Sequence, residues 1–231
     1  MITFLGFDTV VLHYRYSSDN NKIFELFYKA GIKNFIFLFD YDPTIDSISI
    51  MRYKIKQFKE SAVRSAPYRI KIKCIFNLIL TSGAAFNDDI SRLFVSRKNR
   101  ILFLSLPMFT ADNYDSIARD VNHLLYKKHV TLVFTSFEKI IETSSLDFCV
   151  KFINNPRIHL AVELNYLFSP EKQDFFNSVL KSGSGVLPDI SGDIFNYAGI
   201  LASADNILEK YGKKNYYKLC SQINHSSLAL I

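Results

Sequence analysis

Acidic and polar side chains stand where the apolar, strand-like segments of the sequence end. Asp40 ends the segment 34–40, Asp42 follows it, and Asp189 ends the segment 185–189. Carboxylate oxygens are ligands of hard divalent cations, so these three residues are candidates for an oxygen-only metal site. Each could instead cap the turn or helix after its strand. Further polar candidates at strand ends are Asn77, Ser105, Ser136, Glu138, Asn165 and Ser191.

The histidines do not add a recognisable metal-binding or catalytic pattern. None of the five belongs to an H-x-H or H-E-x-x-H motif, and we place none at the carboxyl end of a strand, where barrel enzymes hold catalytic groups. They are His13, His123, His129, His159 and His225. The sequence also lacks the G-x-G-x-x-G, P-loop, G-x-S-x-G and C-x-x-C motifs. We therefore predict no catalytic residue, no bound metal and no cofactor, with residual metal binding at Asp40 and Asp189 left open.

The "SGSG" stretch at 182–185 is a glycine-rich candidate for a phosphate loop. It joins a predicted helix to a predicted strand. A phosphate cradle needs the opposite order, a loop that opens the amino terminus of a helix. The stretch is therefore predicted to end a helix.

Basic side chains are concentrated in one stretch. Residues 52–73 hold eight Lys or Arg against one Glu, a net charge of +7, whereas the whole chain carries +6. On an extended chain, cations spaced by two lie on one face and can follow a phosphate backbone. Tyr53, Phe58 and Tyr68 are then available for base stacking; the alternative is a solvated face of a helix or edge strand. The candidate contacts are Arg52, Lys54, Lys56, Lys59, Arg69, Lys71, Lys73, Arg97, Lys98 and Arg100.

Strand-like and helix-like segments alternate along the chain. The expected strands are 2–12, 34–40, 70–80, 100–107, 130–136, 158–166 and 185–189, and the expected helices are 18–32, 110–128, 144–153, 169–183, 197–212 and 213–223. Apolar strands that are each followed by a helix indicate a parallel sheet with both faces covered. We predict an α/β fold, a TIM-like (β/α)7-8 barrel in a single domain 1–231, with an open doubly wound sheet as the alternative. The basic stretch 41–69 is expected to be an insertion or an elaborated second helix on the barrel surface.

Composition excludes several classes of protein. With 231 residues, 48% hydrophobic and 22% charged, the chain is long and apolar enough to form a core, and is not disordered. Cys74, Cys149 and Cys220 are far apart and lie beside apolar residues, which indicates reduced core thiols. No apolar run reaches the ~18 residues of a membrane span, and the first residues lack the pattern of a signal peptide.

The order of the strands resembles that in one known family. The stretches "YRIKIKCIFNLILTSG", "RKNRILFLSLP", "KKHVTLVFTSFEKI", "RIHLAVELNY" and "GVLPDISG" follow one another as in the thirty-kilodalton TIM-barrel protein subunit of ribonuclease P. The resemblance covers most of the chain, and the "VELNY" stretch at 162–166 and the basic lead-in strand carry it. Two departures stand out. After "VELNY", the stretch "SPEKQDFFNS" has only Lys172 where the family usually has a pair of arginines, and the "DISGDIFNY" stretch lacks the family's arginine.

The same strands also resemble the PHP phosphoesterases, which include metal-dependent tyrosine phosphatases. In that match only Asp189 keeps the type of a metal ligand. The positions of the other ligands would be taken by Leu5, Phe7, Asp40, Asn77, Ser136 and Ser191. Both resemblances therefore imply a PHP-like barrel without hydrolytic chemistry.

The first resemblance implies a non-catalytic, RNA-binding subunit of the ribonuclease P or MRP ribonucleoprotein. Such a subunit supports 5′ processing of precursor tRNA by the catalytic RNA, and is not an enzyme by itself. Its expected partners are the structured RNA and other protein subunits, including a small RRM-like one, with no membrane. Its expected location is the nucleus or nucleolus in a eukaryote and otherwise the cytoplasm. The alternative is a degenerate PHP-family, tyrosine phosphatase-like pseudoenzyme or a phosphoesterase.

Overall fold

The structure is a computed structural model of the whole chain. It describes residues 7–14, 20–66, 69–80, 101–107, 110, 112–127, 130–138, 140, 153–192, 197 and 213–225. The predicted contacts Arg97, Lys98 and Arg100 lie outside these ranges, as do Tyr68, Cys149, His129 and most of the expected helices 144–153 and 197–212.

Seven parallel strands close into a barrel in sequence order, as the sequence predicts. The strands are β1 (Thr9–His13), β2 (Asn34–Tyr41), β3 (Lys71–Ile79), β4 (Ile101–Ser105), β5 (Thr131–Thr135), β6 (Ile158–Glu163) and β7 (Val186–Asp189). Pairing of Val11 with Asp189 joins the last strand to the first. The fold is a TIM-type barrel, and the open doubly wound sheet is wrong because a sheet of that kind keeps two free edges.

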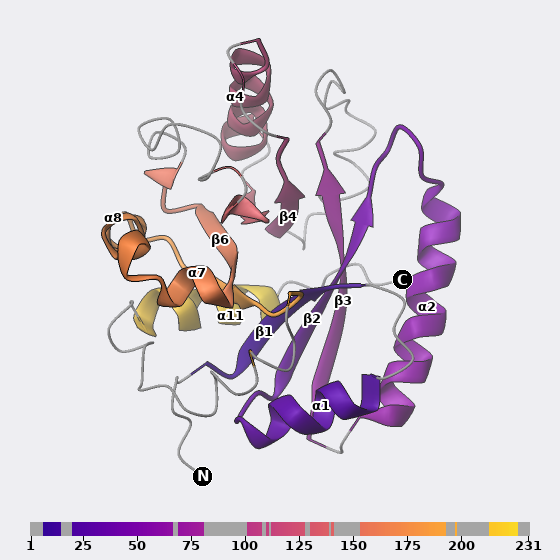
Figure 1. Cartoon of the computed structure of the whole chain (residues 1–231). Helices are drawn as coiled ribbons and strands as arrows, with labels where there is room; N and C mark the ends of the chain where they lie inside the picture. Colours follow the sequence, from indigo (N-terminus) through magenta and orange to yellow (C-terminus); the bar gives the residue numbers. More distant parts are fainter. Residues whose placement is uncertain are drawn as a thin grey trace.

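Helices cover the outside of the barrel and one of its ends (Figure 1). They are α1 (Asn20–Lys29), α2 (Ile48–Ser65), α4 (Tyr114–Asn122), α7 (Leu164–Phe168), α8 (Gln173–Lys181) and α11 (Lys213–His225), with the π-helical turn η1 (His123–Lys127) and the 3₁₀ turn η2 (Pro170–Lys172). Gly31 and Gly183 adopt φ values of 97° and 88°, which suit residues that end helices. The "SGSG" stretch therefore ends α8, as predicted. None of the helices in the described ranges is long and apolar enough to cross a membrane.

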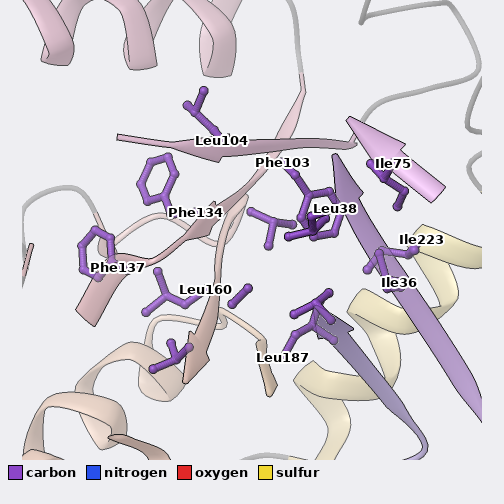
Figure 2. Close-up of a cluster of buried hydrophobic side chains, with 14 of the residues drawn as sticks. Ile36, Leu38, Ile75, Phe103, Leu104, Phe134, Phe137, Leu160, Leu187 and Ile223 are labelled. Carbon is purple, nitrogen blue, oxygen red and sulfur yellow. The ribbon is translucent and has the colours of Figure 1, made fainter. Parts of the chain in front are cut away.

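Alternation along the strands divides their side chains between two hydrophobic layers. Residues paired in register share a side of the sheet, so Leu38, Ile75 and Leu187 belong to the inside of the barrel. Figure 2 shows these side chains gathered between the strands, and Leu104 and Phe134 elsewhere in the same buried cluster. Because both faces are covered, the strands are rich in buried apolar residues, and many of their polar residues stand near the strand ends.

Helix α11 closes the amino-terminal end of the barrel. The hydroxyl of its buried Tyr216 accepts hydrogen bonds from the backbone N–H groups of Asp8 (3.0 Å) and Thr9 (2.8 Å). At the other end of α11, Lys73 Nζ donates to the carbonyl oxygen of Ile223 at 2.6 Å. In Figure 2, Ile223 lies beside Ile36 of β2. Helix α11 is therefore attached to this end of the barrel through β1 and β3.

Several expected boundaries differ from the observed ones, and two of them concern polar residues at strand ends. The strand 158–166 ends at Glu163, because residues from Leu164 onward turn into α7. The strand 2–12 ends one residue later than expected, so that His13 is its last residue. The basic stretch 41–69 contains α2, a helix of 18 residues, which matches the second of its two expected forms.

Candidate functional site

A cavity of about 350 Å³ lies at the carboxyl end of the barrel strands. Its lining residues come from the ends of the strands or the turns after them, and are His13, Tyr14, Asp40, Ile79, Ser105, Leu106, Ser136, Glu138, Ile140, Glu163, Asp189 and Ser191. Six of the polar candidates from the sequence are among them: Asp40, Ser105, Ser136, Glu138, Asp189 and Ser191. We call this cavity the barrel mouth.

His13 connects two carboxylates across the barrel mouth. Its Nδ1 lies 3.1 Å from Asp40 Oδ1, and its Nε2 lies 3.6 Å from Asp189 Oδ2. The prediction that no histidine ends a strand is therefore wrong. Residues 2–12 are mostly apolar but include Thr3, Asp8 and Thr9, so the pattern alone did not show where β1 ends.

Hydrogen bonds from neighbouring strands hold these groups in place. Asn77 donates to Asp40 Oδ1 at 2.7 Å, and its own Oδ1 accepts a bond from Thr135 at 3.0 Å. On the other side of the mouth, Asp189 Oδ1 accepts a hydrogen bond from the backbone N–H of Ser191. The hydroxyl oxygen of Ser191 in turn accepts a hydrogen bond from the backbone N–H of His13 at 2.6 Å. Asn77 is fully buried and belongs to this supporting network below the cavity.

Glu138 is the most unusual group of the mouth. Ser136, at the end of β5, has a φ of 55°, and this left-handed residue turns the chain so that the Glu138 side chain points back over the barrel. Only 6% of Glu138 is exposed, and no hydrogen-bond partner of its Oε2 is found in the described part of the chain. Burial, together with the nearby charges of Asp189 and Glu163, raises its pKa to about 7, although two backbone N–H groups act in the opposite direction.

Glu163 is a mouth residue that the sequence analysis missed. The expected strand 158–166 places Glu163 in mid-strand, whereas Glu163 is the last residue of β6 and pairs with Asp189 in register. Asn165, the candidate named instead, is exposed on α7, and its amide donates to Tyr197. The alternation of inward and outward residues along β6 was the signal that could have identified Glu163.

The proposed oxygen-only metal site does not assemble. Asp42 does not line the mouth, because its Oδ1 accepts hydrogen bonds from the N–H and hydroxyl of Thr44. The alternative interpretation of Asp42, a residue that caps a turn, is confirmed. Phe7, which the PHP resemblance placed at a ligand position, packs against Tyr216 at the opposite end of the barrel.

The basic stretch forms a helix rather than an extended row. Met51, Ile55, Phe58 and Ala62 are buried at helical spacing against β2 and β3, which is why α2 is a helix. At 100° per residue, Arg52, Lys56 and Lys59 share one flank of α2, while Lys54 lies on the other. Phe58, 6% exposed, is therefore unavailable for stacking, whereas Tyr53 is 61% exposed.

The remaining basic candidates divide between surface and interior. Arg52, Lys54 and Lys56 are exposed, and so are Arg69 and Lys71, which lie at the start of β3 near the end of α2 (Figure 1). Lys59 is half-buried. Lys73 is also half-buried, and its bond to Ile223 in α11 makes it part of the barrel closure. Burial and the neighbouring Lys71 lower the pKa of Lys73.

The other titratable candidates are structural. Cys74 and Cys220 are buried free thiols, as predicted, and burial raises the pKa of the first to about 12 and of the second to about 11. His159 is buried in β6, and its Nδ1 accepts a hydrogen bond from the N–H of Gly185 at 2.7 Å. Burial lowers the pKa of His159 to about 4, so it is neutral near pH 7.

Comparisons with known proteins show similarity of structure without similarity of sequence. No protein-family model and no curated protein matches the sequence. Crystal structures of YwqE from Bacillus subtilis and CpsB from Streptococcus pneumoniae, described as metal-dependent tyrosine phosphatases, are similar, with a TM-score of 0.58 and 10% identity over 89% of this chain and 85% of theirs. The phospho-2-dehydro-3-deoxyheptonate aldolase of Thermotoga maritima aligns with a TM-score of 0.45 and 10% identity, over 96% of this chain and 71% of the aldolase.

A metal centre of the kind implied by those phosphatases does not fit the side chains at this mouth. In the described ranges, no group of three or more His, Cys, Asp or Glu side chains is placed to hold a metal ion. The imidazole of His13 faces a carboxylate through each nitrogen, so neither nitrogen is directed with the carboxylates toward a common point. The chain thus has a barrel of seven parallel strands with an acidic mouth, and an exposed set of cations on α2 and at the start of β3.

Proposed function

We propose that the protein is a non-catalytic, RNA-binding subunit of the ribonuclease P or MRP ribonucleoprotein, which supports 5′ processing of precursor tRNA by the catalytic RNA. The observation that carries the proposal is the separation of charge on this barrel. The exposed cations Arg52, Lys54, Lys56, Arg69 and Lys71 belong to α2 and the adjacent start of β3, whereas the cavity is lined by carboxylates.

The exposed cations suit an extended polyanion. Helix α2 has 18 residues, which gives it a length of about 27 Å, and its cations continue beyond it to Arg69 and Lys71. A surface of this length can contact several phosphates of one RNA, and each contact releases counterions and so contributes affinity. The exposed ring of Tyr53 lies among these cations and offers a surface on which a base can stack.

The acidic mouth is an argument against a phosphoesterase. Asp40, Glu138, Glu163 and Asp189 line it, and none of its described lining residues is Lys or Arg. A phosphate monoester entering the cavity would meet like charges at short range, and no described cation would offset their repulsion. A barrel of this kind is better suited to hold RNA on its outer surface, in a nucleus, nucleolus or cytoplasm, together with other protein subunits.

Charge reversal on the basic surface tests the proposal. The triple variant Arg52→Glu, Lys56→Glu and Lys71→Glu changes three exposed positions of the proposed surface. Binding of a precursor tRNA transcript and of a ribonuclease P RNA transcript is measured by filter binding at several salt concentrations. We expect affinity to fall by orders of magnitude, and the slope of log K against log salt to flatten by about 0.7–0.9 for each phosphate that the variant no longer neutralises.

A matched control separates a specific surface from net charge. The variant Lys29→Glu, Lys181→Glu and Lys214→Glu makes the same charge change at exposed positions on α1, α8 and α11. It should retain most of the affinity. Equal losses in both triple variants, or wild-type affinity in the first, would contradict the proposal. Mn²⁺-dependent hydrolysis of an aryl phosphate that is lost in Asp189→Ala would favour the phosphoesterase alternative instead.

A further inference from the structure

We propose that the barrel mouth is a binding site for an organic cation, the guanidinium or ammonium head of an alkyl chain. This inference concerns a different part of the molecule from the RNA-binding surface and stands independently of it. It rests on the charge of the cavity, on one buried oxygen that is directed into it, and on the apolar wall beside that oxygen.

The charge of the mouth selects a cation. Four of its lining residues carry carboxyl groups: Asp40, Glu138, Glu163 and Asp189. Among its described lining residues, only His13 can contribute a positive charge, and its two nitrogens already face Asp40 and Asp189. A cation placed between the carboxylates would reduce their mutual repulsion, whereas an anion would increase it.

Glu138 supplies one carboxylate oxygen, Oε2, that accepts no hydrogen bond from the described residues. More than nine-tenths of this residue is buried, and in the described part of the chain its Oε2 has no hydrogen-bond partner. A buried carboxylate oxygen that accepts no hydrogen bond lowers the stability of the folded state. A hydrogen bond from a charged donor offsets more of that loss than one from a neutral donor. Glu138 therefore marks the place where the N–H groups of the ligand would bind. Because its pKa is raised to about 7, protons should compete with the ligand below neutral pH.

The apolar part of the cavity distinguishes an organic cation from a metal ion. Ile79, Leu106 and Ile140 line the same cavity as the carboxylates, whereas the ring of Tyr14, another lining residue, stacks on Phe39 at 4.4 Å between centroids. An alkyl chain gains from such an apolar wall, whereas a hydrated metal ion gains nothing from it. The volume of about 350 Å³ lies within the range of small-molecule pockets. Such a head group can belong to a free polyamine or guanidine, or to an Arg or Lys side chain of a partner protein.

Isothermal titration calorimetry of the full chain tests the site with two probes. Agmatine represents a free alkyl guanidine, and N-acetyl-arginine N-methylamide represents an arginine side chain in a protein. We expect saturable binding of at least one probe, with a Kd of about the millimolar range or tighter, and weaker binding as the pH falls through 7. Tighter binding of agmatine would show that the cationic head group belongs to a free alkyl guanidine or amine. Tighter binding of N-acetyl-arginine N-methylamide would show that it belongs to a side chain of a partner protein.

Two variants locate the binding. Glu138→Gln removes the charge but keeps the shape, and should weaken binding by about tenfold or more. Glu163→Gln should weaken it as well, because it removes a second carboxylate of the same cavity. The control Glu25→Gln changes an exposed carboxylate on α1 and should leave the affinity unchanged. Absence of saturable binding of either probe, equal affinity of wild type and Glu138→Gln, or saturable binding of Mn²⁺ in place of the probes would each overturn the inference.

Discussion

Replacing Tyr216 with Phe removes a single hydroxyl that joins α11 to the start of β1. That hydroxyl accepts hydrogen bonds from the backbone N–H groups of Asp8 and Thr9 and donates to Asp8 Oδ1 at 3.0 Å. The phenyl ring remains, so its edge-to-face contact with Phe7, at 5.0 Å between centroids, is retained. The substitution therefore isolates the contribution of the hydroxyl to closing the amino-terminal end of the barrel.

The expected cost follows from the groups left without a partner. Thr9 is buried, so water cannot easily replace the acceptor that its N–H would lose. The loss should lower the free energy of unfolding by about 1–3 kcal/mol. The hydrogen bond from the N–H of Asp8 is half-buried, and its loss should lower the free energy of unfolding by a further amount of about 0.5–1.5 kcal/mol. The free energy of unfolding should fall by about 2–4 kcal/mol. For a chain of this size, such a loss lowers Tm by roughly 5–15 °C.

Chemical denaturation and thermal unfolding, each followed by circular dichroism, measure the loss. The neighbouring substitution Tyr217→Phe is the matched control, because it removes the same hydroxyl from a ring that is 42% exposed, and should change stability by no more than about 0.5 kcal/mol. Hydrogen exchange should also accelerate at the amide of Thr9. If Tyr216→Phe is as stable as Tyr217→Phe, then α11 does not close the barrel through this hydroxyl.

Three further predictions concern buried groups. The pKa of Glu138 is raised to about 7, so in this range the folded state holds a proton that the unfolded state has released. Stability should therefore fall as the pH rises from about 4.5 to 7, by up to about 3 kcal/mol, and Glu138→Gln should remove that part of the pH dependence in urea titrations at several pH values. Gly185→Ala would place its Cβ 2.9 Å from the carbonyl oxygen of Asn215, and the resulting overpacking should cost about 1–3 kcal/mol in denaturation experiments; wild-type stability would mean that α11 can move away. Lys73→Met removes the hydrogen bond from Lys73 Nζ to the carbonyl oxygen of Ile223 and should lower stability by about 1–3 kcal/mol, while RNA affinity stays close to that of wild type; a large drop in affinity would restore Lys73 to the RNA-binding surface.

Much of the barrel can be predicted from local patterns. Each of the seven strands lies within or close to an expected segment, because a strand buried on both faces must be apolar and short, whatever its neighbours are. The ends of α1 and α8 follow from Gly31 and Gly183, which adopt the left-handed conformation that such ends require. Helix α2 was harder to predict, because alternating Lys and Ile residues imitate a strand. Its buried residues repeat with helical spacing, and that longer pattern prevails once β2 and β3 provide a surface to bury them.

The sequence by itself determined the type of the barrel, the concentration of positive charge in one stretch, and the buried, reduced state of the described thiols. Only the tertiary structure decided which polar groups meet. His13, Asp40, Glu138, Glu163 and Asp189 come from five separate parts of the chain, and they converge because the barrel brings the carboxyl ends of its strands to one mouth. A shift of one residue in β1 or β6 would direct His13 or Glu163 to the other face of the sheet. That register depends on contacts between segments far apart in the sequence, which local patterns do not record.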